Sequence, residues 1–320
     1  METSPRQHSS VAFLFPGQGS QAVGMGKELA ALYPIAKQTF DEADEALSMK
    51  LSALCFEGPE DRLKMTEITQ PAILTVSVAA WRVLQAEGLA PQYVAGHSLG
   101  EYSAHVCAGT LAFADAVRAV HNRGRYMQEA VPVGVGAMAA ILALPLDQVA
   151  AACAEAAQGE ICQPANINSL DQVVISGHKG AVERAAELCK QKGAKRAVLL
   201  PVSAPFHCAL MQPAQDRMAA DLAALSFRPM SVPLVTNVDG ALISDPAQAR
   251  DALVRQVTGA VQWEKSMRVL MDQGVTEFVE VGPGKVLCGL MRQIDRSRTA
   301  INVEDDASLQ KTKNHLAQKI

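Results

Sequence analysis

The sequence lacks the features of membrane, secreted and nucleic-acid-binding proteins. No apolar run approaches the ~18 residues of a membrane-spanning helix, and the polar N-terminus, residues 1–10, lacks the apolar core of a signal peptide. Acidic and basic residues are interspersed, and the formal net charge is −4 with a pI of about 6.0. We therefore expect neither a membrane nor a nucleic acid among the partners of this protein.

Cysteine pairs are also missing. The seven cysteines are an odd number, they are scattered, and none forms a C-x-x-C pair or a metal-binding spacing. Such cysteines are typical of reduced thiols in the cytosol. We expect a cytoplasmic, monomeric protein that holds no metal.

Strand and helix patterns alternate along most of the chain. The 320 residues, of which 49% are apolar, suffice for one large domain with a smaller insertion. Short apolar runs predict buried strands, and longer helical patterns such as 71–87 separate them; these runs are 11–15, 93–95, 232–236 and 278–281. Strands that alternate with helices predict an α/β fold with a parallel sheet.

The middle of the chain has a different order of elements. Strand patterns and two helical patterns follow each other as β-α-β-β-α-β, with strands at 138–144, 165–168, 173–176 and 196–200 and helices at 146–157 and 181–192. This order is ferredoxin-like. We predict a small subdomain, 133–203, inserted in a discontinuous large α/β domain formed by 1–132 and 204–320. Residues 304–320 read as a weakly attached polar tail.

A serine between two glycines is the first candidate for chemistry. Gly96-His97-Ser98-Leu99-Gly100 matches the G-x-S-x-G elbow, in which a sharp strand-to-helix turn exposes the serine hydroxyl. A strand pattern precedes it, and a helix pattern, 99–108, follows it and ends at Gly109. The N–H groups at the start of that helix favour negative charge. Ser98 is therefore predicted to be a nucleophile.

A serine nucleophile needs a base, and His207 is the best candidate among seven histidines. It lies in an apolar loop after a strand, where catalytic groups often collect. A structural alternative is that it caps the following helix. His97 is the sequence neighbour of Ser98, but successive strand side chains point to opposite faces, so we do not expect it to reach the serine productively. We expect His8 and His315 to lie in tails, and His105, His121 and His178 to be solvated or core histidines within or beside helical surface patterns.

Arg123 interrupts the apolar face of a helix that starts at Phe113. The other positions of that face are Ala116, Val117, Val120, Gly124, Met127 and Val131. An inward-facing arginine is costly unless a carboxylate or a phosphate pairs with it. The partner is either a buried acid of the protein or the free carboxylate of an acyl substrate. Next to an elbow serine, we favour the substrate.

Two further segments are less specific. The glycine loop 16–22 lacks the second strand of a dinucleotide site, because 34–50 reads as a charged helix, and it lacks a Walker lysine. Its better use is close approach to the serine and donation of an N–H group to an oxyanion. The basic cluster of Lys190, Lys192, Lys195 and Arg196 is either a solvated face or a contact for an acidic protein.

Taken together, these segments closely resemble the malonyl-CoA:acyl carrier protein transacylases of bacterial fatty acid synthesis. The matching segments occur in family order from about 11 to 295: FPGQGSQ (15–21), GHSLGEY (96–102), RGRYMQEA (123–130), ANINS (165–169), PFHCALM (205–211), VRQ (254–256), AVQW (260–263) and EVGPGKVL (280–287). The resemblance implies a hydrolase-like parallel-sheet core with a ferredoxin-like insert, and malonyl-CoA and acyl carrier protein as partners.

The resemblance also implies a role for each matching residue. It makes Ser98 the acylated nucleophile and His207 its base, and it implies no cofactor besides the coenzyme A thioester that is a substrate. The remaining roles are an oxyanion hole from the N–H groups of Gln18 and Leu99, a malonyl carboxylate site at Arg123, and a main-chain carbonyl at Gln256 that orients the histidine. Leu99 and Phe206 resemble the residues of malonyl-selecting forms.

Three other functions stay open at this point. The first is a stand-alone malonyltransferase for polyketide synthase carrier domains, which uses the same residues. The second is a serine esterase, which needs an essential Asp or Glu and is indifferent to Arg123. The third is a catalytically inactive module that binds a carrier protein and does not need Ser98.

Overall fold

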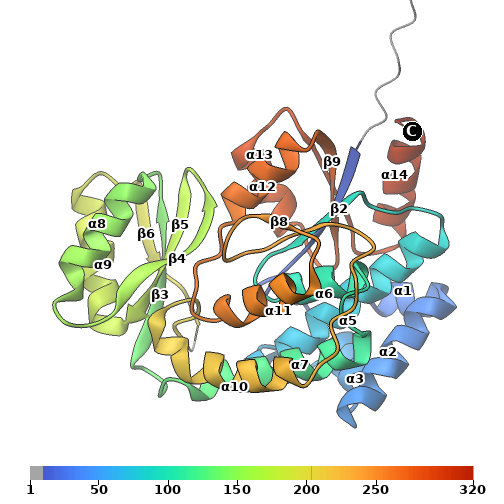
Figure 1. Ribbon diagram of the computed structural model, residues 1–320, viewed down its shortest axis with the longest axis horizontal. Helices are drawn as coiled ribbons and strands as arrows, with labels where there is room; N and C mark the ends of the chain where they lie inside the picture. Colours follow the sequence, from blue (N-terminus) through green and yellow to red (C-terminus); the bar gives the residue numbers. More distant parts are fainter. Residues whose placement is uncertain (1–9, 203, 320) are drawn as a thin grey trace, which may run out of the picture.

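The computed structural model describes residues 10–202 and 204–319, which form two sheets of different kinds (Figure 1). Residues 1–9, Ser203 and Ile320 lie outside the described residues. So do His8 and the predicted end of the insertion at 203. The mixed α/β architecture predicted from the sequence is confirmed, including the β-α-β-β-α-β order of the smaller unit.

The larger sheet has six strands in the order β10-β9-β1-β2-β7-β8. All neighbouring pairs are parallel except β7 and β8. Its strands are β1 (Ser10–Phe15), β2 (Tyr93–Gly96), β7 (Leu234–Val235), β8 (Leu242–Ile243), β9 (Val275–Val281) and β10 (Thr299–Val303). The fully apolar run of β1 lies between β9 and β2, since a central strand is buried on both faces.

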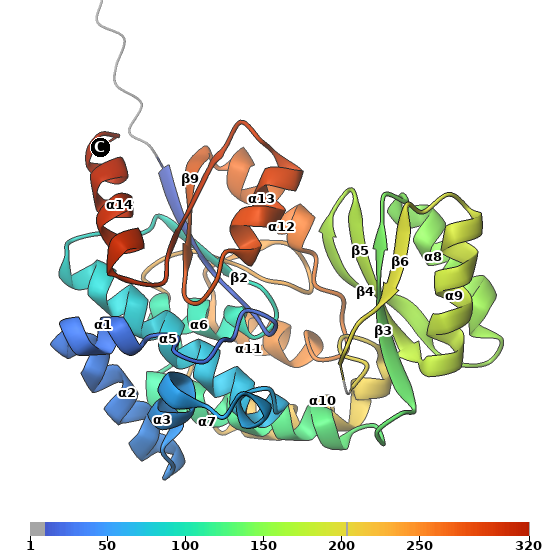
Figure 2. The same ribbon diagram turned by 180° about the vertical axis from the view of Figure 1, so that it is seen from behind.

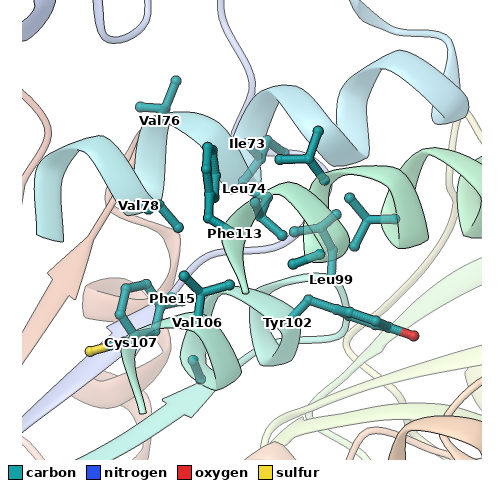
Figure 3. Close-up of a cluster of buried hydrophobic side chains, with 14 of the residues drawn as sticks. Phe15, Ile73, Leu74, Val76, Val78, Leu99, Tyr102, Val106, Cys107 and Phe113 are labelled. Atoms are coloured by element: carbon teal, nitrogen blue, oxygen red, sulfur yellow. The ribbon is translucent and has the colours of Figure 1, made fainter. Parts of the chain in front are cut away.

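Helices cover both faces of this sheet, and each face has its own apolar cluster. The larger cluster includes residues of α1 (Lys27–Leu32), α2 (Pro34–Leu47), α3 (Leu51–Glu57), α4 (Glu60–Leu63), α5 (Thr66–Ala86), α6 (Gly100–Cys107), α7 (Phe113–Glu129), α10 (Gln212–Ala223) and α11 (Pro246–Arg255). The smaller one includes α12 (Trp263–Asp272) and α13 (Val286–Ile294). Figure 3 shows how Leu99, Tyr102 and Val106 anchor α6 in the larger cluster beside Phe113.

Helix α5 begins five residues earlier than predicted, so that Pro71 lies inside it. A proline within a helix leaves the carbonyl four residues before it without its partner, here that of Glu67. The Nδ1 atom of His121 on α7 lies 2.8 Å from this carbonyl oxygen and donates to it. A tertiary contact therefore lets the helix continue through the proline.

The smaller sheet is antiparallel, with the order β4-β5-β3-β6. Its strands are β3 (Gly136–Leu142), β4 (Cys162–Ser169), β5 (Gln172–His178) and β6 (Arg196–Leu199). Helices α8 (Leu146–Ala157) and α9 (Lys179–Gln191) cover one face, as Figure 2 shows. The opposite face holds a small apolar cluster that includes Phe206 of the larger unit.

Backbone bonds tie the two units together. The N–H of Val261 donates to the Ala165 carbonyl at 2.8 Å, and the N–H of Ile167 donates to the Val261 carbonyl at 2.8 Å. These bonds join β4 to the segment before α12. They fix the smaller sheet beside the carboxyl edge of the larger one.

The C-terminal segment differs from the prediction of a weakly attached tail. Residues Asp306–Ala317 form α14, which packs beside β10, and Leu309, Thr312 and Leu316 are buried. Asp305 and Ser308 form a capping box at its start. The polar composition concealed a narrow apolar stripe, which is enough to dock a helix on a sheet edge.

Candidate active site

Ser98 occupies the turn between β2 and α6 with a φ of 52°, the left-handed backbone of a nucleophile elbow. The two glycines of the motif are needed because the chain passes itself closely here. A Cβ atom on Gly96 would lie 1.9 Å from the Gly100 carbonyl oxygen, and one on Gly100 would lie 2.0 Å from that of Phe15. The turn therefore places Ser98 at the carboxyl edge of the larger sheet.

His207 lies against this serine. Its Nε2 atom is 2.7 Å from Ser98 Oγ, and its Nδ1 atom is 2.9 Å from the Gln256 carbonyl oxygen and 3.1 Å from that of Gly259. Because carbonyl oxygens only accept, Nδ1 carries the proton and Nε2 is left to accept from the serine hydroxyl. Burial, followed by the charge of Arg123, lowers the pKa of His207 to about 3, so the imidazole is neutral near pH 7.

Arg123 reaches the same serine from α7. Its side chain is 1% exposed, and its Nη2 atom donates to Ser98 Oγ at 3.1 Å and to Gln256 Oε1 at 2.9 Å. Its Nη1 atom donates to Gln70 Oε1 at 2.9 Å. Within the described part of the chain no carboxylate lies within ion-pair distance of this guanidinium. The structural ion pair that the sequence left open is therefore not present among these residues.

The two predicted oxyanion donors face the same space. Gln18 and Leu99 line a cavity of about 420 Å³ together with Ser98, Arg123 and His207. The amide N–H groups of Gln18 and Leu99 have no hydrogen-bond partner among residues 10–202 and 204–319. The glycine loop approaches the elbow closely, since a Cβ atom on Gly17 would lie 2.5 Å from the His97 carbonyl oxygen.

The cavity lies between the two units. Met138, Asn166, Leu200 and Val202 from the smaller unit and its exit segment form one wall, and Phe206 lies beside them. The larger unit contributes Lys64, Gln70 and Met127 on the other side. Six of the seven predicted site residues thus line one cavity, and the seventh, Gln256, is connected to it through its contacts with Ser98, Arg123 and His207.

Sequence reasoning missed a set of side chains that support the elbow. Asn237 accepts from the Ser98 N–H at 2.6 Å and donates to the Gly96 carbonyl at 2.6 Å. The Gln256 side chain donates to the Ser98 carbonyl at 2.9 Å and to Glu101 at 2.6 Å. No local pattern could have shown these contacts, because they join residues more than 130 positions apart.

The other histidines have separate roles. His97 lines the cavity, and its Nε2 atom lies 2.8 Å from Asn168 Oδ1, while burial lowers its pKa. His105, expected to be either a solvated or a core histidine, is fully buried because α6 is enclosed on all sides, and its ring nitrogens have no partner in the described structure.

Neither a metal site nor a membrane-spanning helix is found within the described residues. No group of three or more His, Cys, Asp or Glu side chains within the described residues could hold a metal ion. None of the helices in the described part of the chain combines the length and apolar character of a membrane span. The cavity brings together a serine hydroxyl, an imidazole, two amide N–H groups and a guanidinium.

A model of the acyl transferase domain matches residues 12–317. The malonyl CoA-acyl carrier protein transacylase of Salmonella typhimurium is 55% identical over 299 residues, which are 93% of this chain and 97% of that protein. This chain belongs to the malonyl CoA-acyl carrier protein transacylase family. The resemblance found in the sequence motifs is confirmed.

Solved structures of this transacylase family share the whole fold. An acyl carrier protein S-malonyltransferase from Vibrio cholerae superposes with a TM-score of 0.93 at 52% identity, over 95% of this chain and 100% of that one. A malonyl-transacylase in complex with a type II PKS acyl-carrier protein superposes with a TM-score of 0.94 at 49% identity, over 96% and 100%. The hydrolase-like core with its ferredoxin-like insert is thus the fold of the family.

Proposed function

We propose that this protein transfers a malonyl group from malonyl-CoA to the phosphopantetheine thiol of acyl carrier protein through a malonyl-Ser98 ester. One observation carries the choice of malonyl: a buried guanidinium, with no carboxylate of the described residues within ion-pair distance, lies 3.1 Å from the hydroxyl that attacks. In a malonyl group a single methylene carbon separates the carboxylate from the thioester carbon. The guanidinium of Arg123 can therefore hold the carboxylate of the same acyl group whose thioester carbon the Ser98 hydroxyl attacks.

The first half-reaction forms the ester. Nε2 of His207 takes the proton of Ser98 Oγ, and the oxygen attacks the thioester carbon. The N–H groups of Gln18 and Leu99 are placed to donate to the resulting oxyanion, and one such donor is typically worth about 3 kcal/mol. The carbon–sulfur bond then breaks, and His207 returns the proton to the sulfur of coenzyme A.

The second half-reaction runs in the opposite sense. His207 deprotonates the phosphopantetheine thiol, the sulfur attacks the malonyl ester, and Ser98 leaves with the proton from His207. The scheme uses no metal and no redox cofactor. An acetyl group supplies no carboxylate to Arg123, which disfavours acetyl transfer by about 1–3 kcal/mol or more.

The names of the relatives support these substrates, and two of the alternatives fit the geometry less well. Both hydrogen-bond acceptors of His207 Nδ1, of which the one at Gln256 was predicted, are main-chain carbonyls, whereas an esterase with an essential acid places a carboxylate there. An inactive binding module has no need of the 2.7 Å contact between Ser98 and His207. Cytoplasmic location and the monomeric state remain predictions.

Intact-protein mass spectrometry tests the proposal. The protein mixed with malonyl-CoA is expected to gain one malonyl group, which Ser98→Ala abolishes, and to gain far less acetyl from acetyl-CoA. Added holo carrier protein should remove the adduct, and the apo form, which lacks the thiol arm, serves as the control. An adduct that persists in Ser98→Ala, or equal labelling by both acyl groups, contradicts the proposal.

A polyketide carrier is the second candidate acceptor. It is favoured by the similarity to a malonyl-transacylase in complex with a type II PKS acyl-carrier protein. Competition between holo carriers of the two pathways for the same malonyl-enzyme separates the candidates. We expect the fatty acid carrier to be malonylated faster, and the reverse order would assign the protein to the polyketide pathway.

A further inference from the structure

A buried carboxylate lies directly beneath the elbow and takes no part in the proposed mechanism. Glu101 on α6 is fully buried, and its Oε2 atom accepts from Gln256 Nε2 at 2.6 Å and from the Asn237 N–H at 3.1 Å. Its Oε1 atom has no hydrogen-bond partner among the described residues. A buried acid with an unpartnered oxygen is costly, which indicates a role other than packing.

Gln256 connects this carboxylate to the guanidinium. Its NH₂ group faces two groups that only accept, the Glu101 carboxylate and the Ser98 carbonyl, so its Oε1 atom must face a donor. That donor is Arg123 Nη2, at 2.9 Å. Glu101 therefore helps to fix the amide that holds Arg123, and the main-chain carbonyl of the same Gln256 accepts from His207.

The surroundings of Glu101 contain few other charges. Arg123 faces it from α7, Tyr102 from its own helix, and Asp239 from the loop after β7, where Arg255 pairs with it. His207 is neutral near pH 7. Burial raises the pKa of Glu101 to about 7, and the bonds from Gln256 and Asn237 and the charge of Arg123 oppose this rise. Arg123 is therefore the one cation among these groups that favours the ionised carboxylate.

We propose that Glu101 is the counter-charge of Arg123 in the empty site, and that a carboxylate bound to Arg123 takes over this role while Glu101 binds one proton. The inference rests on the proposed function, which supplies the malonyl carboxylate. With that ligand in place, an ionised Glu101 would leave two buried anions for one buried cation. The proton comes from solvent, and Oε1 is the oxygen free to hold it.

The sign of the pH dependence of acylation follows from the number of protons that the free and the acylated protein bind. Below the pKa of Glu101 in the free protein, the group is already protonated and acylation requires no proton. Above that pKa, each acylation binds a proton, so the ratio of acylated to free protein falls by up to tenfold per pH unit. In the isosteric, uncharged Glu101→Gln this dependence is absent.

Glu280 supplies a matched control. It is also fully buried, and burial raises its pKa to about 7. Its carboxylate accepts from the N–H groups of Leu287 and Cys288 at the start of α13, away from the cavity. Glu280→Gln therefore removes a comparable buried charge without touching Arg123.

The test equilibrates the wild-type protein, Glu101→Gln and Glu280→Gln with one fixed ratio of malonyl-CoA to coenzyme A, from about pH 6 to about pH 8, below the ordinary thiol pKa. Intact-protein mass spectrometry then gives the acylated fraction. The ratio of acylated to free protein should fall with pH in the wild type and in Glu280→Gln relative to Glu101→Gln. Identical pH dependence in wild type and Glu101→Gln overturns the inference.

Two further measurements distinguish failure of the proposed function from failure of the role assigned to Glu101. If the wild type forms no adduct at any pH, the proposed function fails and not the role of Glu101. Circular dichroism shows whether Glu101→Gln folds. If it does not, the inference is tested by proton uptake when the wild type is mixed with malonyl-CoA in weak buffer. Uptake approaching one proton per acylated protein above pH 7 supports the inference, and no uptake contradicts it.

Discussion

Two arginines in this molecule, Arg123 and Arg255, have opposite surroundings. Arg255 is 42% exposed and forms a bidentate pair with Asp239, at 2.8 and 2.9 Å, and a further bond to Asp251 at 2.6 Å. Arg123 is buried, yet within the described residues its guanidinium donates hydrogen bonds only to amide and hydroxyl oxygens. Arg255 thus pairs with two carboxylates, whereas none of the described carboxylates is in direct contact with Arg123.

The difference shows how a binding site can be told from a structural ion pair. Surface pairs are worth little because water already solvates both charges, so their loss is tolerated. A buried guanidinium without a carboxylate in direct contact is held in place at a cost, and the carboxylate of a ligand can offset that cost. The orientation of Arg123 is fixed by Gln70 and Gln256 before any ligand arrives.

The largest expected difference between the two arginines is their effect on kcat/KM for malonyl-CoA. Arg123→Ala should lower kcat/KM for malonyl-CoA on the order of 10²- to 10³-fold, because truncating one partner of a buried charge pair costs about 2–5 kcal/mol. Transfer from acetyl-CoA should fall far less. Steady-state assays with both donors measure this, and Arg255→Ala, the matched change, should stay within about threefold of wild type.

If Arg123→Ala and Arg255→Ala each lowered malonyl transfer and acetyl transfer by the same factor, the selectivity assigned to Arg123 would be wrong. Arg123→Lys sharpens the test further. Lysine keeps the charge but not the planar fork that contacts Gln70, Gln256 and Ser98 together, so we expect it to restore only part of the malonyl preference.

A smaller effect is expected on ligand-induced stability. In Ser98→Ala, which cannot be acylated, malonyl-CoA at about 100 times its Kd should stabilise the fold by about 2.7 kcal/mol. Thermal unfolding with malonyl-CoA and acetyl-CoA measures the part due to the carboxylate. The double variant Ser98→Ala/Arg123→Ala should lose the difference between the two ligands, whereas Ser98→Ala/Arg255→Ala should keep it.

The smallest expected effect is that of the Arg255–Asp239 ion pair on the free energy of unfolding. Arg255→Ala should lower the free energy of unfolding by about 0.2–1 kcal/mol. The bonds from Arg255 lower the pKa of Asp239, so this contribution is present above the ordinary carboxyl pKa and is lost as pH falls through the lowered value. Urea unfolding at neutral and acidic pH checks this, and a loss of several kcal/mol would show that the pair is not a simple surface pair.

Local patterns predicted much of the site. The elbow at Ser98 follows from a strand, two glycines and a helix that are adjacent in sequence, and the inward direction of Arg123 follows from helical periodicity. The same rules could have predicted α14, where Leu309 and Leu316 share one face and Asp305 caps the start. That error came from weighing polar composition over periodicity.

Contacts over long sequence separations could not be predicted in this way. Gln70, Asn237 and Glu101 are ordinary polar residues in their own segments, and their importance comes from what the fold brings against them. Likewise, the adjacent residues Arg255 and Gln256 end up in different environments, one at the surface and the other fully buried. Helix α11 ends at Arg255, and the side chains of Arg255 and Gln256 point in different directions from this end.

The sequence by itself determined the local geometry of this protein: its α/β order, the exposed serine at a strand-to-helix turn, and an arginine on an apolar helix face. Short-range sterics and periodicity are sufficient for those features, since each is complete within a few residues. Only the tertiary structure decided that no carboxylate of the described chain reaches Arg123 and that Glu101 lies behind it, bridged by Gln256. Buried polar groups must find partners wherever the packed chain offers them, and those partners here come from segments far apart in the sequence.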